Sequence, residues 1–140
     1  MELSVKIDEL IRAYIATVEE LNKKARPFDG VFGMGNDVRK DPCHMKVYED
    51  IQAAVESAAA GGISSEEADC AAEALLKAET AYTCPSCCGM MLTALQGHII
   101  PLAAHMSAAK REELRSWMDT SIPKRRRLPI QNTLYKALKG

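Results

Sequence analysis

Apolar residues recur at steps of three and four over the first part of the chain. The positions are Ile7, Leu10, Ile11, Tyr14, Ile15, Val18 and Leu21. In a helix of about 3.6 residues per turn, this spacing places all of them on one side. It therefore predicts an amphipathic helix over residues 3–24. The helix is expected to end before Pro27, because proline disfavours helical geometry in the residue that precedes it.

A stretch with many turn-forming residues follows, over residues 25–41. Gly30, Gly33 and Gly35 allow backbone conformations that other residues avoid, and no helical spacing of apolar residues runs through them. We therefore predict a long glycine-containing loop. Phe28 and Phe32 are expected to fix this loop to the core, since long loops in compact domains tend to be functional or mobile.

Two further helices are predicted from capping residues and apolar spacing. Asp41 can cap a helix in which Pro42 takes the first position, where the missing amide of proline costs nothing. Ser64 and Glu67 have the spacing of a capping box, in which a serine and a glutamate satisfy the free amides of a first turn. We expect this capping box to open an alanine-rich helix that runs to about Tyr82.

Proline, serine and glycine residues also mark the ends of the predicted helices in the second half of the chain. A fourth helix is expected to start beside Pro85 and to end at Gly97. Ser107 can cap a fifth helix that Pro123 closes, and a last short helix is predicted over residues 130–138. No run alternates between apolar and polar residues in the way that a strand exposed on one face does.

Length and composition agree with one compact all-α domain. The chain has 140 residues, of which 47% are hydrophobic and 26% charged, with a formal net charge of -1, the balance of a globular protein. We expect a single-domain bundle of five or six helices over residues 1–122. Residues 123–140 are expected to form a basic linker and a short helix that packs on this bundle or extends from it.

The sequence carries no sign of a membrane segment or a secretory signal. No apolar run approaches the roughly 20 residues that cross a bilayer, and the acidic start of the chain lacks the basic and apolar regions of a signal peptide. We therefore expect a cytoplasmic protein. In that compartment cysteines are kept reduced, so structural disulfides are not expected.

The placement of the cysteines predicts a metal site. Cys84 and Cys87 form a C-x-x-C pair at a predicted helix start, and Cys43 lies in the first turn of another predicted helix. Helix N-termini favour thiolates, and a structural zinc ion takes four Cys or His ligands. If the two helix starts meet, these three thiols bind zinc, with His44 or Cys88 as the fourth ligand. Neighbouring residues rarely bind the same ion, so one member of each adjacent pair is expected to stay outside the site.

Other interpretations of the cysteines remain open. Buried thiols can pack as small hydrophobic groups without any ligand. The sequence CPSC also resembles a dithiol oxidoreductase or metal-trafficking motif, in which Cys84 attacks and Cys87 resolves. Such motifs usually follow a strand, which this chain lacks, so a non-enzymatic role is favoured. Cys70 is expected to be inert, and His98 and His105 are expected to be ordinary core or surface histidines.

Charge divides the chain into two unequal parts. Residues 1–100 hold 9 basic and 16 acidic side chains, whereas residues 101–140 hold 9 basic and 3 acidic ones. Lys124, Arg125, Arg126 and Arg127 are consecutive and follow a proline. They form either a solvated linker or a contact for nucleic acid or a protein partner. No lipidation signal accompanies them, so no membrane partner is expected. The sequence thus predicts a metal-stabilised binding or scaffolding module.

Overall fold

The computed structural model describes residues 2–24, 38, 40–83 and 88–140. All regular elements in these ranges are helical, which confirms the predicted fold class. The described residues form seven α-helices and two 3-10 helices, more than the five or six helices expected. The predicted loop over residues 25–41 lies largely outside the described ranges. Within those ranges, no helix combines the length and the apolarity that crossing a bilayer requires.

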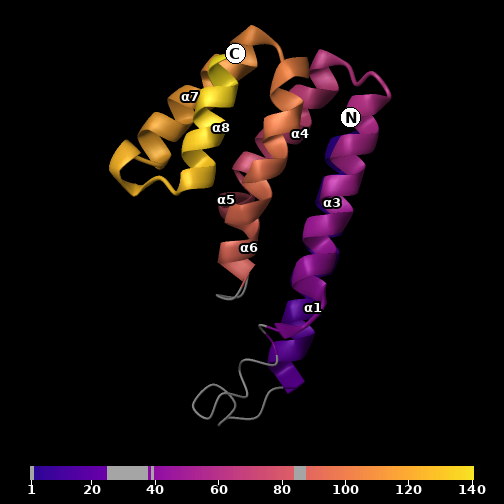
Figure 1. Ribbon diagram of the computed structural model, residues 1–140. Helices are drawn as coiled ribbons and strands as arrows, with labels where there is room; N and C mark the ends of the chain where they lie inside the picture. The colour runs from indigo at the N-terminus through magenta and orange to yellow at the C-terminus, as the bar shows by residue number, and fades with distance from the viewer. Residues whose placement is uncertain (1, 25–37, 39, 84–87) are drawn as a thin grey trace.

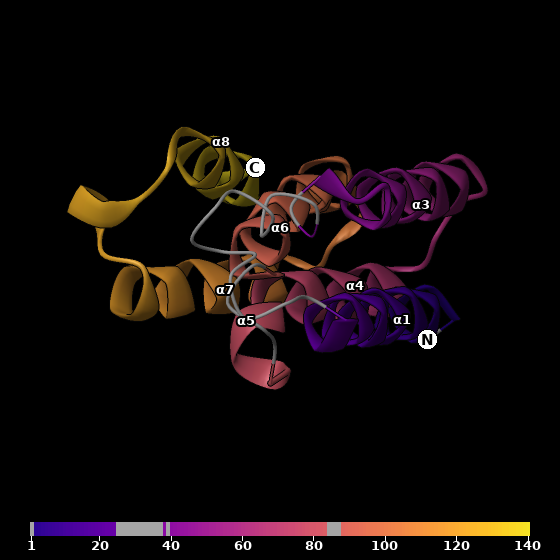
Figure 2. The same cartoon turned by 90° about the horizontal axis from the view of Figure 1, so that it is seen from below.

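The helices form an antiparallel bundle with a helical hairpin packed on it (Figure 1). The elements, with α for α-helices and η for 3-10 helices, are α1 Glu2–Lys24, α3 Cys43–Ala60, α4 Ser65–Leu76, α5 Ala78–Ala81, α6 Gly89–Ala94, η2 Leu95–His105, α7 Ala108–Ser121, η3 Lys124–Arg126 and α8 Pro129–Lys139. Helix α1 packs on α3 and α4, and both of these pack on η2. Helix α8 packs on η2 and on α7, so the α7–α8 hairpin covers the bundle from one side (Figure 2).

The core is made of aliphatic side chains contributed by every major helix. The fully buried large side chains include Ile7, Ile11, Ile51, Leu75, Leu76, Leu92, Leu95, Ile99, Leu102, Leu114, Met118, Leu134 and Leu138. Burying each such side chain contributes roughly 1.5–3 kcal/mol relative to leaving it in water. Ala68, Ala71 and Ala72 are also fully buried. Their small size allows α4 to approach α1 and η2 closely.

Helix caps lie where the sequence predicts them. The Ser64 hydroxyl accepts a hydrogen bond from the amide of Glu67 at 3.2 Å, and the Ser107 hydroxyl accepts one from the amide of Lys110, also at 3.2 Å. The carboxylate of Glu67 reaches the first turn of α1, where it accepts from the amide of Leu3 at 3.3 Å. The residues that begin α4 therefore also fix the start of α1.

Two predicted helix limits are wrong. The alanine-rich helix does not run unbroken to Tyr82, because it ends at Leu76 and a short α5 follows Lys77. The predicted end at Gly97 is also wrong, since helical structure continues through Gly97 and Pro101 to His105. A Cβ atom at position 97 would lie 3.1 Å from Cδ1 of Ile130. The glycine therefore serves close packing against α8 and does not terminate the helix.

Candidate functional site

The start of α3 places Cys43 beside a carboxylate. The amide of Cys43 donates to Oδ2 of Asp41 at 3.0 Å. The cap was predicted one residue too early, because the N-cap of α3 is Pro42 and the helix begins at Cys43. Hydrogen bonds from the amide and then the thiol of Cys43 lower the pKa of the Asp41 carboxyl. The Cys43 side chain is half-buried and lines a groove of about 160 Å³ together with Tyr14 and Lys46. The thiol is thus accessible from this groove.

His44 uses both of its ring nitrogens in hydrogen bonds. Nδ1 lies 2.7 Å from the hydroxyl of Tyr14, and Nε2 lies 2.7 Å from the backbone carbonyl of Val38. Because the carbonyl can only accept, Nε2 carries the proton and Nδ1 accepts from Tyr14. A metal ion could bind His44 only after one of these bonds had been broken. His44 is therefore engaged in holding α3 against α1.

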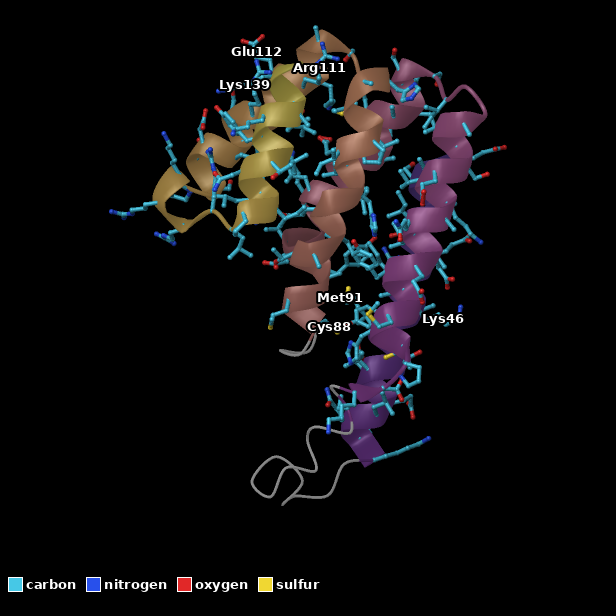
Figure 3. The ribbon with its side chains drawn as sticks, in the orientation of Figure 1. Lys46, Cys88, Met91, Arg111, Glu112 and Lys139 are labelled. Carbon is cyan, nitrogen blue, oxygen red and sulfur yellow. The ribbon has the colours of Figure 1, made fainter. Side chains whose placement is uncertain are left out.

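Cys88 immediately precedes α6 and is fully buried. Its side chain belongs to the hydrophobic core, and the Cys43 side chain packs against the same core. Helices α3 and α6 contact each other, and both begin at the same end of the bundle (Figure 1). In Figure 3, Cys88 and Met91 lie between α6 and α3, near the end of α3 that carries Lys46. The fold thus brings the start of α3 and the start of α6, with Cys43 and Cys88, to one end of the bundle.

Cys84 and Cys87 lie outside the described residues. The chain is fixed shortly before them, because the hydroxyl of Tyr82 donates to the carboxylate of Asp8 on α1. Burial and then this hydrogen bond raise the pKa of Tyr82 to about 12. Arg12 also pairs with Asp8 at 2.9 Å. With Cys88 buried in the core on the other side, both flanks of this short stretch are held in place.

The remaining cysteine and the acidic residues add no further cluster. Cys70 is exposed on α4 and forms no disulfide. Among residues 2–24, 38, 40–83 and 88–140, no three His, Cys, Asp or Glu side chains gather in a way that could hold a metal ion. Any four-ligand site at the start of α3 would therefore need at least two ligands from outside these ranges.

His98 is an unusual core residue that the sequence analysis did not single out. It is 5% exposed, and its ring lies 4.4 Å from the ring of Tyr48, measured between centroids. Nε2 is buried and has no hydrogen-bond partner among the described residues. Burial is the main reason why the pKa of His98 is lowered, and a backbone contact with Tyr48 and the charge of Glu56 oppose it. The apolar neighbours of His98 in sequence were the available signal for its burial.

The basic run contains two kinds of residue. Lys124, Arg125 and Arg126 form η3 and are exposed. The Arg127 side chain is only 5% exposed, and it pairs with Asp119 at 2.9 Å. Its Nε also donates to the carbonyl of Ile122 at 2.8 Å. Arg127 therefore fastens the turn between α7 and α8, and only the other three cations are available to a partner.

Comparisons with known protein families, with curated proteins and with solved structures find no match to this chain.

Proposed function

We propose that this protein is a helical scaffold whose fold is stabilised by a zinc ion at the common end of α3 and α6. Cys43, Cys84 and Cys87 are the proposed core ligands. The observation that carries the proposal is that α3 and α6 begin at the same end and contact each other. Thiols near two helix starts then face a shared positive potential, which favours the thiolates that zinc needs.

The two candidates for the fourth ligand are Cys88 and His44. His44 already makes two short hydrogen bonds, whereas Cys88 directly precedes α6. Adjacency opposes both candidates equally, because Cys88 follows Cys87 and His44 follows Cys43. Loss of the Tyr14 or Val38 contact would further oppose ligation by His44, so we propose Cys88 for this position. Ligation of Cys43 would release its thiol proton and leave Asp41 with the amide bond alone.

A zinc ion at this end would supply folding free energy. Binding energy of a site that exists only in the folded state adds to the stability of the fold, by about 2.7 kcal/mol when the free ion is at 100 times its dissociation constant. All four proposed ligands are protein groups, which is typical of structural zinc sites. The proposal therefore describes a binding module in the reducing cytoplasm and assigns it no chemical reaction.

Metal content and thermal stability test this proposal. Reduced protein purified with zinc is expected to carry one ion per chain, measured by native mass spectrometry, and a chelator is expected to lower its Tm. Cys43→Ser and Cys84→Ser should abolish retention of the ion. Cys70→Ser is the matched control, because this exposed thiol lies in the middle of α4. His44→Gln should keep the ion if Cys88 is the fourth ligand, and Cys88→Ala should lose it.

A chain without bound zinc and with a Tm that the chelator leaves unchanged would contradict the metal proposal. The alternative is thiol redox chemistry or metal transfer by Cys84 and Cys87. It would require a Cys84 thiolate that forms well below the ordinary thiol pKa of about 8.5. Alkylation rates of Cys84 measured against pH in the Cys43→Ser/Cys70→Ser/Cys88→Ala variant distinguish that alternative from a zinc scaffold.

A further inference from the structure

A groove of about 670 Å³ lies between the α7–α8 hairpin and the α4–α6 side of the bundle. Its apolar lining comes from elements that are distant in sequence, namely Leu76, Trp117, Ile122, Pro123 and Leu128. This volume is in the range of sites that bind a ligand or a few side chains of a partner. The groove is independent of the proposed zinc site, which involves the start of α3.

Polar groups in the groove floor are fixed by one another. The Gln131 side-chain amide donates to Oε1 of Gln96 at 2.9 Å, and the Gln96 amide donates to the carbonyl of Leu76 at 3.2 Å. Both glutamines line the groove. Gln96 is 4% exposed and Gln131 is 6% exposed. Each side-chain amide has a second N–H group. The floor thus presents preorganised donors in a lining that mixes apolar and polar side chains.

The rim of the groove is basic and partly apolar. Arg126 lines the groove, and Lys124 and Arg125 precede it on the same turn. None of the three forms an ion pair with a described carboxylate. Leu128, also in the lining, is 50% exposed. The turn projects from the rest of the molecule in Figures 1 and 2. The rim therefore combines an exposed apolar side chain with three cations that have no ion pair among the described residues.

The one acidic residue in the lining does not neutralise this rim. Glu79 belongs to the wall opposite the hairpin, and its carboxylate accepts a hydrogen bond from the hydroxyl of Thr93. On the same side of the groove, the ammonium group of Lys77 lies 5.8 Å from the centroid of the Trp117 ring. Glu79 is therefore a single negative charge across the opening from the three cations of the hairpin turn.

We propose that this groove docks an acidic segment of a partner protein, with one or two large apolar side chains inserted beside Trp117 and Leu128. The apolar lining would accept those side chains, and the acidic flanks would pair with Lys124, Arg125 and Arg126. Charge complementarity selects the acidic segment, and the apolar side chains of the lining favour a protein over nucleic acid. Arg127 holds the turn in place, so the cationic rim is formed before the partner binds.

Trp117 provides a direct readout of docking, since it is the only tryptophan in the chain. The probe is a synthetic peptide in which Glu residues flank a Leu and a Phe at helical spacing. Binding is expected to shift the emission of Trp117 and to raise the anisotropy of the labelled peptide. Two matched peptides, with Lys in place of Glu or with Ser in place of Leu and Phe, should bind at least about tenfold more weakly.

Surface variants locate the docking site without disturbing the core. Leu128→Ser and the triple variant K124Q/R125Q/R126Q should each raise the dissociation constant of the acidic peptide by about tenfold or more. The control triple K6Q/K23Q/K24Q removes three exposed lysines from α1 and should leave it unchanged. The affinity should also fall as salt is increased from 50 to 200 mM, because exposed ion pairs are screened.

Four results would overturn the proposal. The first is the absence of any Trp117 shift with the acidic peptide at low salt, and the second is binding that the two groove variants leave unchanged. The third is preferential binding of a single-stranded oligonucleotide over the peptide, which would assign the cations to nucleic acid. The fourth is salt-sensitive self-association in sedimentation experiments that the K124Q/R125Q/R126Q variant abolishes, since this would identify a second copy of the chain as the occupant.

Discussion

The guanidinium carbon of Arg127 lies 4.3 Å from the centroid of the Tyr135 ring. The hydroxyl of Tyr135 donates to Oδ2 of Asp119, and Oδ1 of Asp119 accepts from Arg127. These three side chains therefore form a closed set that joins α7, the turn and α8. Arg127 looks identical in sequence to the exposed arginines before it, yet it has a structural role that they do not share.

Arg127→Ala is expected to lower the free energy of unfolding by about 1–3 kcal/mol, because the carbonyl of Ile122 loses a charged donor and Tyr135 loses its stacked cation. Arg126→Ala removes an exposed arginine one position earlier and should change the stability by less than about 0.5 kcal/mol. Urea denaturation of the two variants measures the difference. Equal midpoints for both variants would show that the Arg127 contacts contribute nothing to stability.

His98 is expected to make the fold less stable in mild acid. Because burial lowers the pKa of His98, the unfolded chain takes up this proton at a higher pH than the folded chain does. Its contribution is present in full above the ordinary histidine pKa of 6.5 and is lost as the pH falls towards the folded-state value. The slope from one such group is at most about 1.4 kcal/mol per pH unit.

Urea midpoints measured at several pH values between 7.5 and 5.5 test this expectation. The His98→Leu variant keeps an apolar side chain at the buried position and removes the titrating group. Its stability should change less over this pH range than that of the wild type. The two proteins share all other histidines, so the difference between them reports His98. If both proteins lose stability in parallel, the acid sensitivity originates elsewhere in the chain.

Gln131 has two roles that a single substitution removes together. Its Oε1 accepts from the amide of Leu128 at 2.9 Å, which caps α8, and its amide group satisfies Oε1 of Gln96. Gln131→Ala is therefore expected to destabilise the protein by about 1–3 kcal/mol. In a double-mutant cycle with Gln96→Ala, the double variant should lose less stability than the two single variants added together. Additive effects would indicate that the buried amide pair is energetically unimportant.

Substitution of Ser107 is expected to lower the stability more than substitution of Ser64, the other predicted serine cap. Besides capping α7, its amide and hydroxyl donate to the two carboxylate oxygens of Asp69 at 2.9 and 2.7 Å. Ser107→Ala should thus cost about 1–2 kcal/mol, at the upper end for loss of a cap. Ser64→Ala is the comparison, and thermal denaturation should show a smaller loss. A larger effect at position 64 would contradict the assigned role of Asp69.

Local signals in the sequence predicted the helices, but contacts between distant segments determined their exact extent. The apolar spacing of the first helix and the caps at Ser64 and Ser107 were sufficient because they depend on neighbouring residues only. The break at Lys77 carries no glycine or proline, and the continuation through Gly97 depends on Ile130 of another helix. No pattern within a single segment reports such a contact.

The candidate functional residues, like the helices, could be predicted only where the signal came from neighbouring residues. Proline and aspartate before Cys43 indicated a thiol at a helix start, and Cys43 is the first residue of α3. The predicted meeting of this start with Cys84 and Cys87 stays a prediction, because those two residues lie outside the described ranges. The use of both His44 nitrogens could not be foreseen, because Tyr14 lies 30 residues away. The apolar groove also went unpredicted, since its lining is assembled only when α7 and α8 fold back on the bundle.

The contact between η2 and α8 is close because residue 97 is a glycine. With no side chain at position 97, Ile130 can pack directly on the backbone of η2. The side-chain amide of Gln131, the next residue of α8, can then donate to Oε1 of Gln96. A methyl group there would lie 3.1 Å from Cδ1 of Ile130, so that side chain would have to move aside by a few tenths of an ångström. The close fit of the C-terminal helix at this point therefore relies on the smallest amino acid.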